Sequence, residues 1–178
     1  MIVINLFGAA CSGKSTLAAE IFYQLKKAGK NTELALEFVK DSVYDGNPYP
    51  FQDQIYVFAN QLKKLRQFDE KVDYVVTDSP LLLSHIYAGE KESAEFHMLI
   101  DAEWKKYHNI NFFLNHQNLS YVSEGRLDTY NDRDKISNSI LIILSLFHDS
   151  YKKISVNTKI EDIMQYIEEE SKKYEVSN

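Results

Sequence analysis

The sequence contains a single cysteine, Cys11, so no disulfide can form within the chain and we expect a reducing compartment. It also lacks a long apolar run. The longest, at 140–147, is far shorter than the roughly 20 residues that a membrane-spanning helix needs. The apolar first residues carry no basic segment, which argues against a secretory signal peptide. We therefore expect a cytoplasmic protein that does not associate with membranes.

Positive charge is scarce as well. Twenty lysines and arginines stand against 26 aspartates and glutamates, which gives a net charge of −6. This balance argues against broad, nonspecific binding of duplex DNA, which requires a basic face. The sequence also shows no internal repeat, low-complexity tract or linker. Its 178 residues, 44% of them hydrophobic, predict one globular domain over residues 1–178.

Short apolar runs alternate with amphipathic segments along the chain. This alternation predicts βαβ units with right-handed crossovers, and therefore an α/β domain whose five-stranded parallel sheet is covered by helices on both faces. The predicted strands lie at 2–7, 32–39, 72–78, 110–115 and 151–157, and the predicted helices at 14–29, 51–68, 93–108, 135–149 and 159–174.

The segment GAACSGKST, between the first strand and the first helix, matches the phosphate-binding pattern G-x-x-x-x-G-K-[ST]. Gly8 and Gly13 allow the tight turns that point backbone N–H groups inward. Lys14 is expected to reach the β- and γ-phosphates, Ser15 to bind Mg²⁺ through its hydroxyl, and Thr16 to contact the α-phosphate. The predicted nucleoside triphosphate site comprises Gly8, Ala9, Ala10, Cys11, Ser12, Gly13, Lys14, Ser15 and Thr16.

A second acidic position follows the third predicted strand. Asp78 ends the run YVVTD, at the carboxyl edge of the sheet where open α/β folds collect ligands. If the third strand neighbours the first, Asp78 lies beside the phosphate loop and serves as the carboxylate on the Mg²⁺ side, through a water or as a base. The alternative is an acid that caps the next segment.

The choice among phosphate-loop proteins depends on what else is absent. There is no N/T-K-x-D segment to read guanine, so adenine is the expected base and a GTPase is disfavoured. Only three arginines are present, and two of them, Arg126 and Arg133, lie in the polar stretch after the fourth strand. Phosphoryl transfer uses such permanently charged, planar donors on a segment that closes over the site. The alternative is a solvated loop in which the arginines pair with Asp128, Asp132 and Asp134.

The second strand and the helix after it are expected to bind the acceptor. Glu37 is the candidate general base for an attacking hydroxyl, with Asp41 nearby. Gln54 and Gln61 lie on the following helix, where they would read a base edge unless they are simply exposed. The candidates for stacking on a ring are Tyr56 or Phe58 in that helix and Tyr44, Tyr49 and Phe51 in the loop before it.

Taken together, GAACSGKST, LEFVKD, FQDQIYVFANQ, VVTDSPLLLSHIYA and EGRLDTYNDR make the chain resemble P-loop kinases of the thymidylate-kinase and nicotinamide-riboside-kinase-like group. It is especially similar to short AAA-type ATPase/kinase proteins of bacteriophages. The resemblance implies a three-layer αβα sandwich, a LID segment at about 118–134, and ATP with Mg²⁺. Two departures concern the acceptor: Ser79 and Pro80 follow Asp78 where thymidylate kinases have an arginine, and Lys40 stands where an arginine is expected.

Three functions stay open at this point. The first is transfer of the γ-phosphoryl group of ATP to a small nucleoside, nucleotide or modified pyrimidine. The second is the same transfer to 5-hydroxymethyluracil within DNA, with Lys63, Lys64 and Arg66 as a local basic groove. The third is an ATP-binding switch with little chemistry. The oligomeric state is open between monomer and homodimer, and a phage-encoded protein would act in the host cytoplasm.

Overall fold

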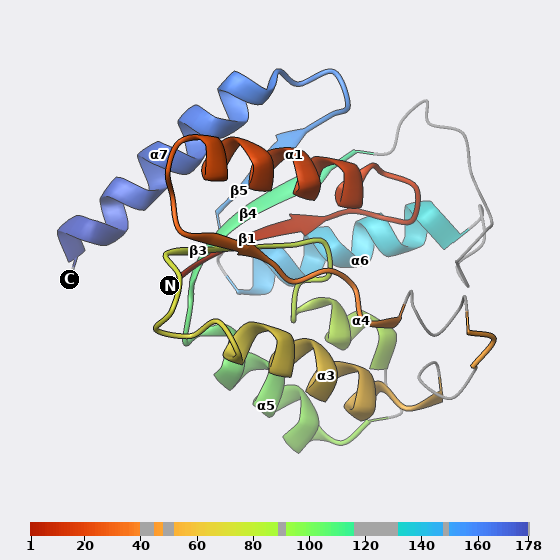
Figure 1. The fold of residues 1–178 in the computed structure, drawn as a ribbon. Helices are drawn as coiled ribbons and strands as arrows, with labels where there is room; N and C mark the ends of the chain where they lie inside the picture. The colour runs from red at the N-terminus through yellow and green to blue at the C-terminus, as the bar shows by residue number, and fades with distance from the viewer. Residues whose placement is uncertain (40–44, 48–51, 89–91, 116–131, 148–149, 178) are drawn as a thin grey trace.

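The computed structural model describes residues 1–39, 45–47, 52–88, 92–115, 132–147 and 150–177, which form a parallel β-sheet between two layers of helices (Figure 1). The strand order is β2-β3-β1-β4-β5, and every pairing is parallel. The predicted five-stranded parallel sheet is therefore confirmed. The strands are β1 (Ile2–Phe7), β2 (Thr32–Leu34), β3 (Tyr74–Thr77), β4 (His108–Leu114) and β5 (Tyr151–Ile154).

The alternation of side chains along β1 divides the core into two halves. Ile2, Ile4 and Leu6 pack on one face of the sheet, against α1 (Lys14–Lys27) and α7 (Ile160–Ser177). Val3 and Phe7 pack on the opposite face. Both faces of the central strand are thus apolar and covered, as parallel sheets require. The helices of the second layer are α3 (Gln54–Arg66), α4 (Leu83–Ala88), α5 (Ala94–Trp104) and α6 (Arg133–Leu146).

Several elements differ from the sequence-based expectation; β5 ends at Ile154 instead of residue 157, and α5 ends at Trp104 instead of residue 108. Strand β2 ends at Leu34 instead of continuing to residue 39. The amide of Ala35 still donates to the carbonyl of Val76, but the amide of Glu37 donates to the side chain of Asp78 and not to a strand partner. The ladder therefore stops where β3 stops. Helix α4 was not predicted, although its position just after Pro80 is typical of a helix start.

Within the described part of the chain, no helix is both long enough and apolar enough to cross a membrane.

A chain of polar side chains joins α4 to α5. The Nε2 of His85 lies 2.8 Å from the carboxylate of Asp101, and its Nδ1 lies 2.8 Å from the Nδ1 of His97. Neutral His85 satisfies both contacts by donating from Nε2 and accepting at Nδ1. The ring of Phe147 lies against His85 from the end of α6. Burial lowers the pKa of His85 below its usual value, and this effect exceeds the opposing effect of Asp101.

This arrangement predicts a loss of stability in mild acid. The unfolded chain protonates His85 near pH 6.5, whereas the lowered pKa of the folded state resists protonation. The stabilising contribution is therefore present above the unfolded pKa and is lost as the pH falls below it. We expect the melting temperature of His85→Gln to depend less on pH than that of the wild type between pH 7.5 and 5.5. Equal pH dependence of the two proteins would contradict the prediction.

His108 is the internal reference for that measurement. It stacks on Tyr174, and burial lowers its pKa too. It thus adds a pH dependence of the same sign that His85→Gln leaves in place. A further decrease in the pH dependence of a His85→Gln/His108→Gln double variant would separate the two contributions.

Candidate nucleotide-binding site

The loop between β1 and α1 has a backbone that only specific residues can adopt. A Cβ on Gly8 would lie 2.6 Å from the Oγ of Ser12 and 2.8 Å from the carbonyl oxygen of Leu114, so no larger residue fits there. Cys11 and Gly13 have φ values of 58° and 89°, in the left-handed region. Positive φ values within such a short segment turn successive N–H groups toward one side, which is the geometry of an anion-binding nest.

The first turn of α1 adds to this positive potential. Its N-cap is Gly13, which provides no side-chain cap, and its first turn contains no acidic residue. The N-terminal amides of α1 therefore face no carboxylate of their own helix, as expected where a phosphate binds. The ammonium of Lys14 curls back over the loop, 2.7 Å from the carbonyl of Gly8 and 3.0 Å from that of Ala9. Loop, helix end and ammonium thus converge on one point.

The predicted metal ligands lie side by side. The Oγ of Ser15 donates to Oδ2 of Asp78 at 2.6 Å, although the two residues are 63 positions apart in sequence. The pairing of β3 with β1 brings Asp78 to the phosphate loop, as the sequence predicted. Asp78 is only 5% exposed, and its Oδ1 accepts a hydrogen bond from the amide of Glu37 at 2.8 Å. Both carboxylate oxygens are therefore held in place.

This donor set suits Mg²⁺. A hydroxyl and a carboxylate are the hard oxygen ligands that Mg²⁺ takes from proteins, with phosphates and waters completing its shell. Their contact at 2.6 Å, beside a nest for phosphate, places them where a metal bound to the nucleotide needs ligands. Ser15 and Asp78 together therefore fit the cation, although neither would hold it strongly alone.

The residues predicted to bind the acceptor separate into two groups. Gln54 and Tyr56 are accessible: Nε2 of Gln54 donates to Oγ of Ser84 at 3.3 Å, and Tyr56 is 39% exposed beside the ring of Phe38. The prediction for Gln61 is wrong as a direct contact. It is 4% exposed, and its amide donates to the carbonyl of Ala35 and the hydroxyl of Thr77.

Phe58 is also excluded as a stacking platform. It is 2% exposed and makes an edge-on contact with Phe96, 5.5 Å between ring centroids, inside the core between α3 and α5. A ligand ring has no access to it. The stacking residue that α3 offers is therefore Tyr56, on the exposed side of the same helix.

Of the two arginines of the predicted LID, the structure describes only Arg133. Arg133 is the first residue of α6 and is 3% exposed, so it belongs to a packed helix end and not to a solvated loop. Arg126 lies outside the described residues. The same is true of Lys40, Asp41, Tyr44, Tyr49 and Phe51.

The proposed basic groove for DNA is weakened by its own contacts. The guanidinium of Arg66 binds the buried carboxylate of Glu103 at 2.7 Å, and the ammonium of Lys64 donates to the carbonyl of Leu36. Glu103 also binds Lys106, so its charge is shared between two cations that are each about half exposed. These contacts join α3 to the segment after β2 and to α5, so two of the three cations of the predicted groove help to hold the fold.

A surface beside the phosphate loop was missed in the sequence. A cavity of about 620 Å³ opens at the carboxyl ends of β4 and β5, with Asn115, Asn138, Ser155 and Thr158 among its lining residues. Val156 lies in the turn between β5 and α7, and its Cγ1 would be 3.8 Å from a Cβ added to Gly13. The short run SVNT carries no motif, and only the adjacency of β4 and β5 to β1 brings it to the site.

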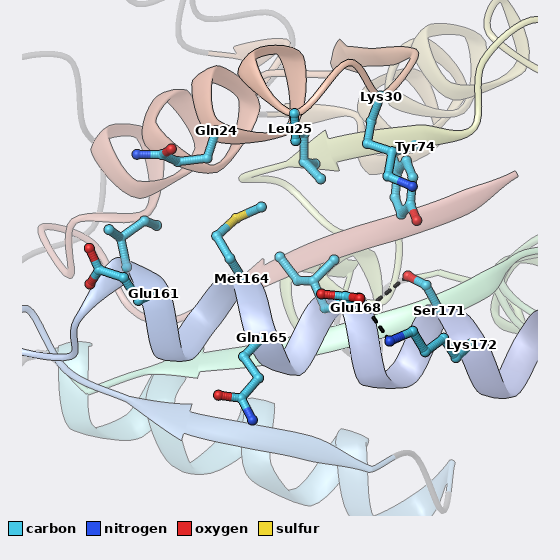
Figure 2. Close-up of a pocket in the computed structure, with 13 residues that line it drawn as sticks. Gln24, Leu25, Lys30, Tyr74, Glu161, Met164, Gln165, Glu168, Ser171 and Lys172 are labelled. Atoms are coloured by element: carbon cyan, nitrogen blue, oxygen red, sulfur yellow. Dashed lines mark hydrogen bonds and ion pairs between the residues drawn. The ribbon is translucent and has the colours of Figure 1, made fainter.

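A second cavity, of about 670 Å³, lies away from these groups between α1 and α7 (Figure 2). Leu25 and Met164 point toward each other across it, and Tyr74, the first residue of β3, lies at one end. Glu168 at its rim is paired with Lys172. Since β3 begins at Tyr74, this end lies at the amino edge of the sheet, opposite the edge that carries Asp78. The cavity takes no part in the nucleotide site.

Comparison with known proteins agrees with this geometry. The chain has the fold of shikimate kinases, which are P-loop kinases. It superposes on the enzyme from Acinetobacter baumannii in complex with shikimate with a TM-score of 0.55, 16% identity and coverage of 94% of this chain and 93% of that one. For the enzyme from Aquifex aeolicus the TM-score is 0.53, with 15% identity and coverage of 99% and 100%. No curated protein sequence matches the chain. The family model of AAA_28, described as an AAA domain, matches residues 3–162, and the chain belongs to this family.

Proposed function

We propose that the protein is an ATP- and Mg²⁺-dependent phosphotransferase whose acceptor is a small nucleoside, nucleotide or modified pyrimidine. The observation that carries this proposal is the contact between Ser15 and Asp78 at 2.6 Å, beside a phosphate-binding loop on a kinase-type fold. This contact supports Mg²⁺–nucleotide binding, which a nucleotide-dependent switch shares with a kinase. A kinase also needs an acceptor site that opens onto the same sheet edge.

Different residues of the chain are assigned to phosphate binding, metal binding and activation of the acceptor. The amides of the loop and Lys14 bind the phosphates, and Ser15 with Asp78 would hold Mg²⁺, which neutralises charge on the β- and γ-phosphates. The acceptor oxygen forms a bond to the γ-phosphorus while the bond to the β–γ bridging oxygen breaks, and ADP leaves. Glu37 is exposed and its amide donates to Asp78, which supports our assignment of its carboxylate to orient an acceptor hydroxyl and take its proton.

The acceptor side is formed by α3 and α4. Gln54 is partly exposed and donates to the buried hydroxyl of Ser84, and its amide oxygen retains hydrogen-bonding capacity for a polar ligand. The exposed face of Tyr56 offers a ring for stacking. Shikimate, the ligand of a structurally similar kinase, has no aromatic ring that could stack on tyrosine. An acceptor that contains a base therefore suits these residues better. On the nucleotide side, the cavity beside the β5–α7 turn suits the nucleoside of ATP.

The direct test is acceptor-dependent release of ADP. Purified protein with ATP and Mg²⁺ is offered deoxynucleosides, their monophosphates, 5-hydroxymethyl derivatives, shikimate, and duplex DNA that contains 5-hydroxymethyluracil. We expect stimulation by at least one nucleoside or nucleotide, with the phosphorylated product found by mass spectrometry. Stimulation by the DNA alone would move the acceptor to the polymer, and tight ATP binding without stimulation by any acceptor would leave only the switch.

Replacement of Arg126 is a second experiment that distinguishes a kinase from a nucleotide-binding switch. Arg126→Ala should lower kcat at least tenfold if the guanidinium stabilises the migrating group, with ATP affinity nearly unchanged. Arg133→Ala is less suitable, because Arg133 is 3% exposed and its loss would disturb the start of α6. Lys27→Ala is the control for the loss of one positive charge, since Lys27 is exposed in the last turn of α1. A kcat of Arg126→Ala equal to that of the control would contradict the role.

A further inference from the structure

Two buried polar side chains beside the site have no part in the roles described above. Gln61, in α3, is 4% exposed, and Thr77, the last residue of β3, is fully buried. Nε2 of Gln61 donates to the carbonyl of Ala35 at 3.2 Å and to Oγ1 of Thr77 at 3.3 Å. The hydroxyl of Thr77 donates to the same carbonyl at 2.7 Å. The three groups thus connect α3 to the carboxyl ends of β2 and β3.

This network involves the residues on both sides of Asp78 in the chain, together with the segment whose amide binds its carboxylate. The amide of Ser79 donates to Oγ1 of Thr77 at 3.1 Å, so one hydroxyl restrains the backbone before and after Asp78. Ala35 lies two residues before Glu37, whose amide donates to Oδ1 of Asp78. The network therefore restrains both the residue that carries the carboxylate and the amide that binds it.

Packing alone does not explain the polarity of these positions. Oε1 of Gln61 is buried and has no hydrogen-bond partner among the described residues. Burying an amide group whose oxygen has no partner is unfavourable relative to an apolar side chain of similar size. Leucine or methionine would fill the same space without this cost. What the polar groups contribute is the position of the two strand ends.

We propose that Gln61 and Thr77 are positioning residues for the Mg²⁺–nucleotide site. They act through Ala35 and the backbone at Ser79 to hold Asp78 against Ser15. This inference rests on the proposed function to the extent that Ser15 and Asp78 bind the metal that accompanies ATP. It gives Gln61 a role one step removed from the ligand, in place of direct contact with an acceptor.

The test measures the Mg²⁺ dependence of nucleotide binding and needs no acceptor. Binding of a fluorescent ATP analogue is measured at fixed concentrations of protein and analogue while the Mg²⁺ concentration is varied. The affinity for the analogue is then measured in EDTA, without free Mg²⁺. Thr77→Val keeps the shape of the side chain but removes the hydroxyl. It should raise the Mg²⁺ concentration for half-maximal binding about tenfold, the lower end of the effect of losing a group that holds a metal ligand in place. Thr77→Ser keeps the hydroxyl and should match the wild type. Affinity measured in EDTA should be the same for all variants.

Gln61→Met and Asn60→Ala complete the design. Gln61→Met leaves the Thr77–Ala35 bond intact, so it tests the network even if Thr77→Val fails to fold, and it should shift the Mg²⁺ requirement in the same direction. Among the described residues, the side chain of Asn60 bonds to the carbonyl of Tyr56 in its own helix, so Asn60→Ala should cause no shift. The proposal is overturned if Thr77→Val and Gln61→Met bind with the Mg²⁺ dependence of the wild type, or if wild-type binding ignores Mg²⁺. A shift without turnover on any acceptor would uphold the positioning role and reject the kinase.

Discussion

Asp78→Asn should lower acceptor-dependent ADP release by about two to three orders of magnitude, as expected when a charged group that holds the catalytic metal is neutralised. Asparagine has the shape of aspartate, and its carbonyl can still accept from the amide of Glu37 at the position now taken by Oδ1. Its NH₂ group can donate to the hydroxyl of Ser15. Both hydrogen bonds survive while the negative charge is lost, so the fold should be retained and the metal ligand removed.

Asp73→Asn is the matched control for this experiment. Asp73 directly precedes β3, so it lies at the amino end of the strand whose carboxyl end leads to Asp78, and it is exposed. The two variants change the net charge of the protein equally, but only one changes the site. Rates are measured by coupled ADP assay across a range of Mg²⁺ concentrations, together with melting temperatures. If Asp78→Asn is as active as Asp73→Asn at every Mg²⁺ concentration, Asp78 does not hold the metal.

The nucleotide side of the site could be predicted because its chemistry is local in sequence. Gly8, Gly13, Lys14 and Ser15 fall within eight consecutive residues, and the structure shows the turn and helix end that their pattern implies. Asp78 required one further assumption, that the third strand neighbours the first. The parallel pairing of β1 with β3 confirms it.

The acceptor side was harder to predict because helical spacing does not identify the neighbours of a side chain. Gln54 and Gln61 are seven residues apart and were predicted to act together. The structure separates them, since Gln54 begins α3 near Ser84 whereas Gln61 lies beneath the ends of β2 and β3. The contacts that bury Gln61 come from Ala35 and Thr77, which are 26 and 16 residues away. No pattern within α3 could reveal them.

The shortened β2 and the burial of Arg133 have similar causes. The apolar pattern of 32–39 fits a longer strand, but the amide of Glu37 binds the side chain of Asp78 just after β3, and this competes with the ladder. The polar run before α6 resembles a loop up to residue 134, yet α6 begins at Arg133 and packs that residue inside. In both places a tertiary contact decides where an element begins or ends.

Lys14→Met should abolish productive nucleotide binding, with a loss of about a thousandfold in kcat/KM for ATP, because its ammonium lies at the phosphate loop and would bind the phosphates directly. Methionine has a similar length and no charge. Lys14 is only partly buried, and it contacts the carbonyls of Gly8 and Ala9 at the loop itself. The melting temperature without nucleotide should therefore change little, while stabilisation by added ATP and Mg²⁺ should disappear.

Lys27→Met is the control at the other end of the same helix. Lys27 lies in the last turn of α1, with its ammonium 5.8 Å from the ring centroid of Tyr23. It is exposed, and its loss changes the net charge as Lys14→Met does. Only the cation at the N-terminal end should matter if phosphate binds there, because the attraction depends on position and not on total charge. If ATP raises the melting temperature of Lys14→Met as much as that of Lys27→Met, the loop does not hold the triphosphate and the kinase proposal loses its foundation.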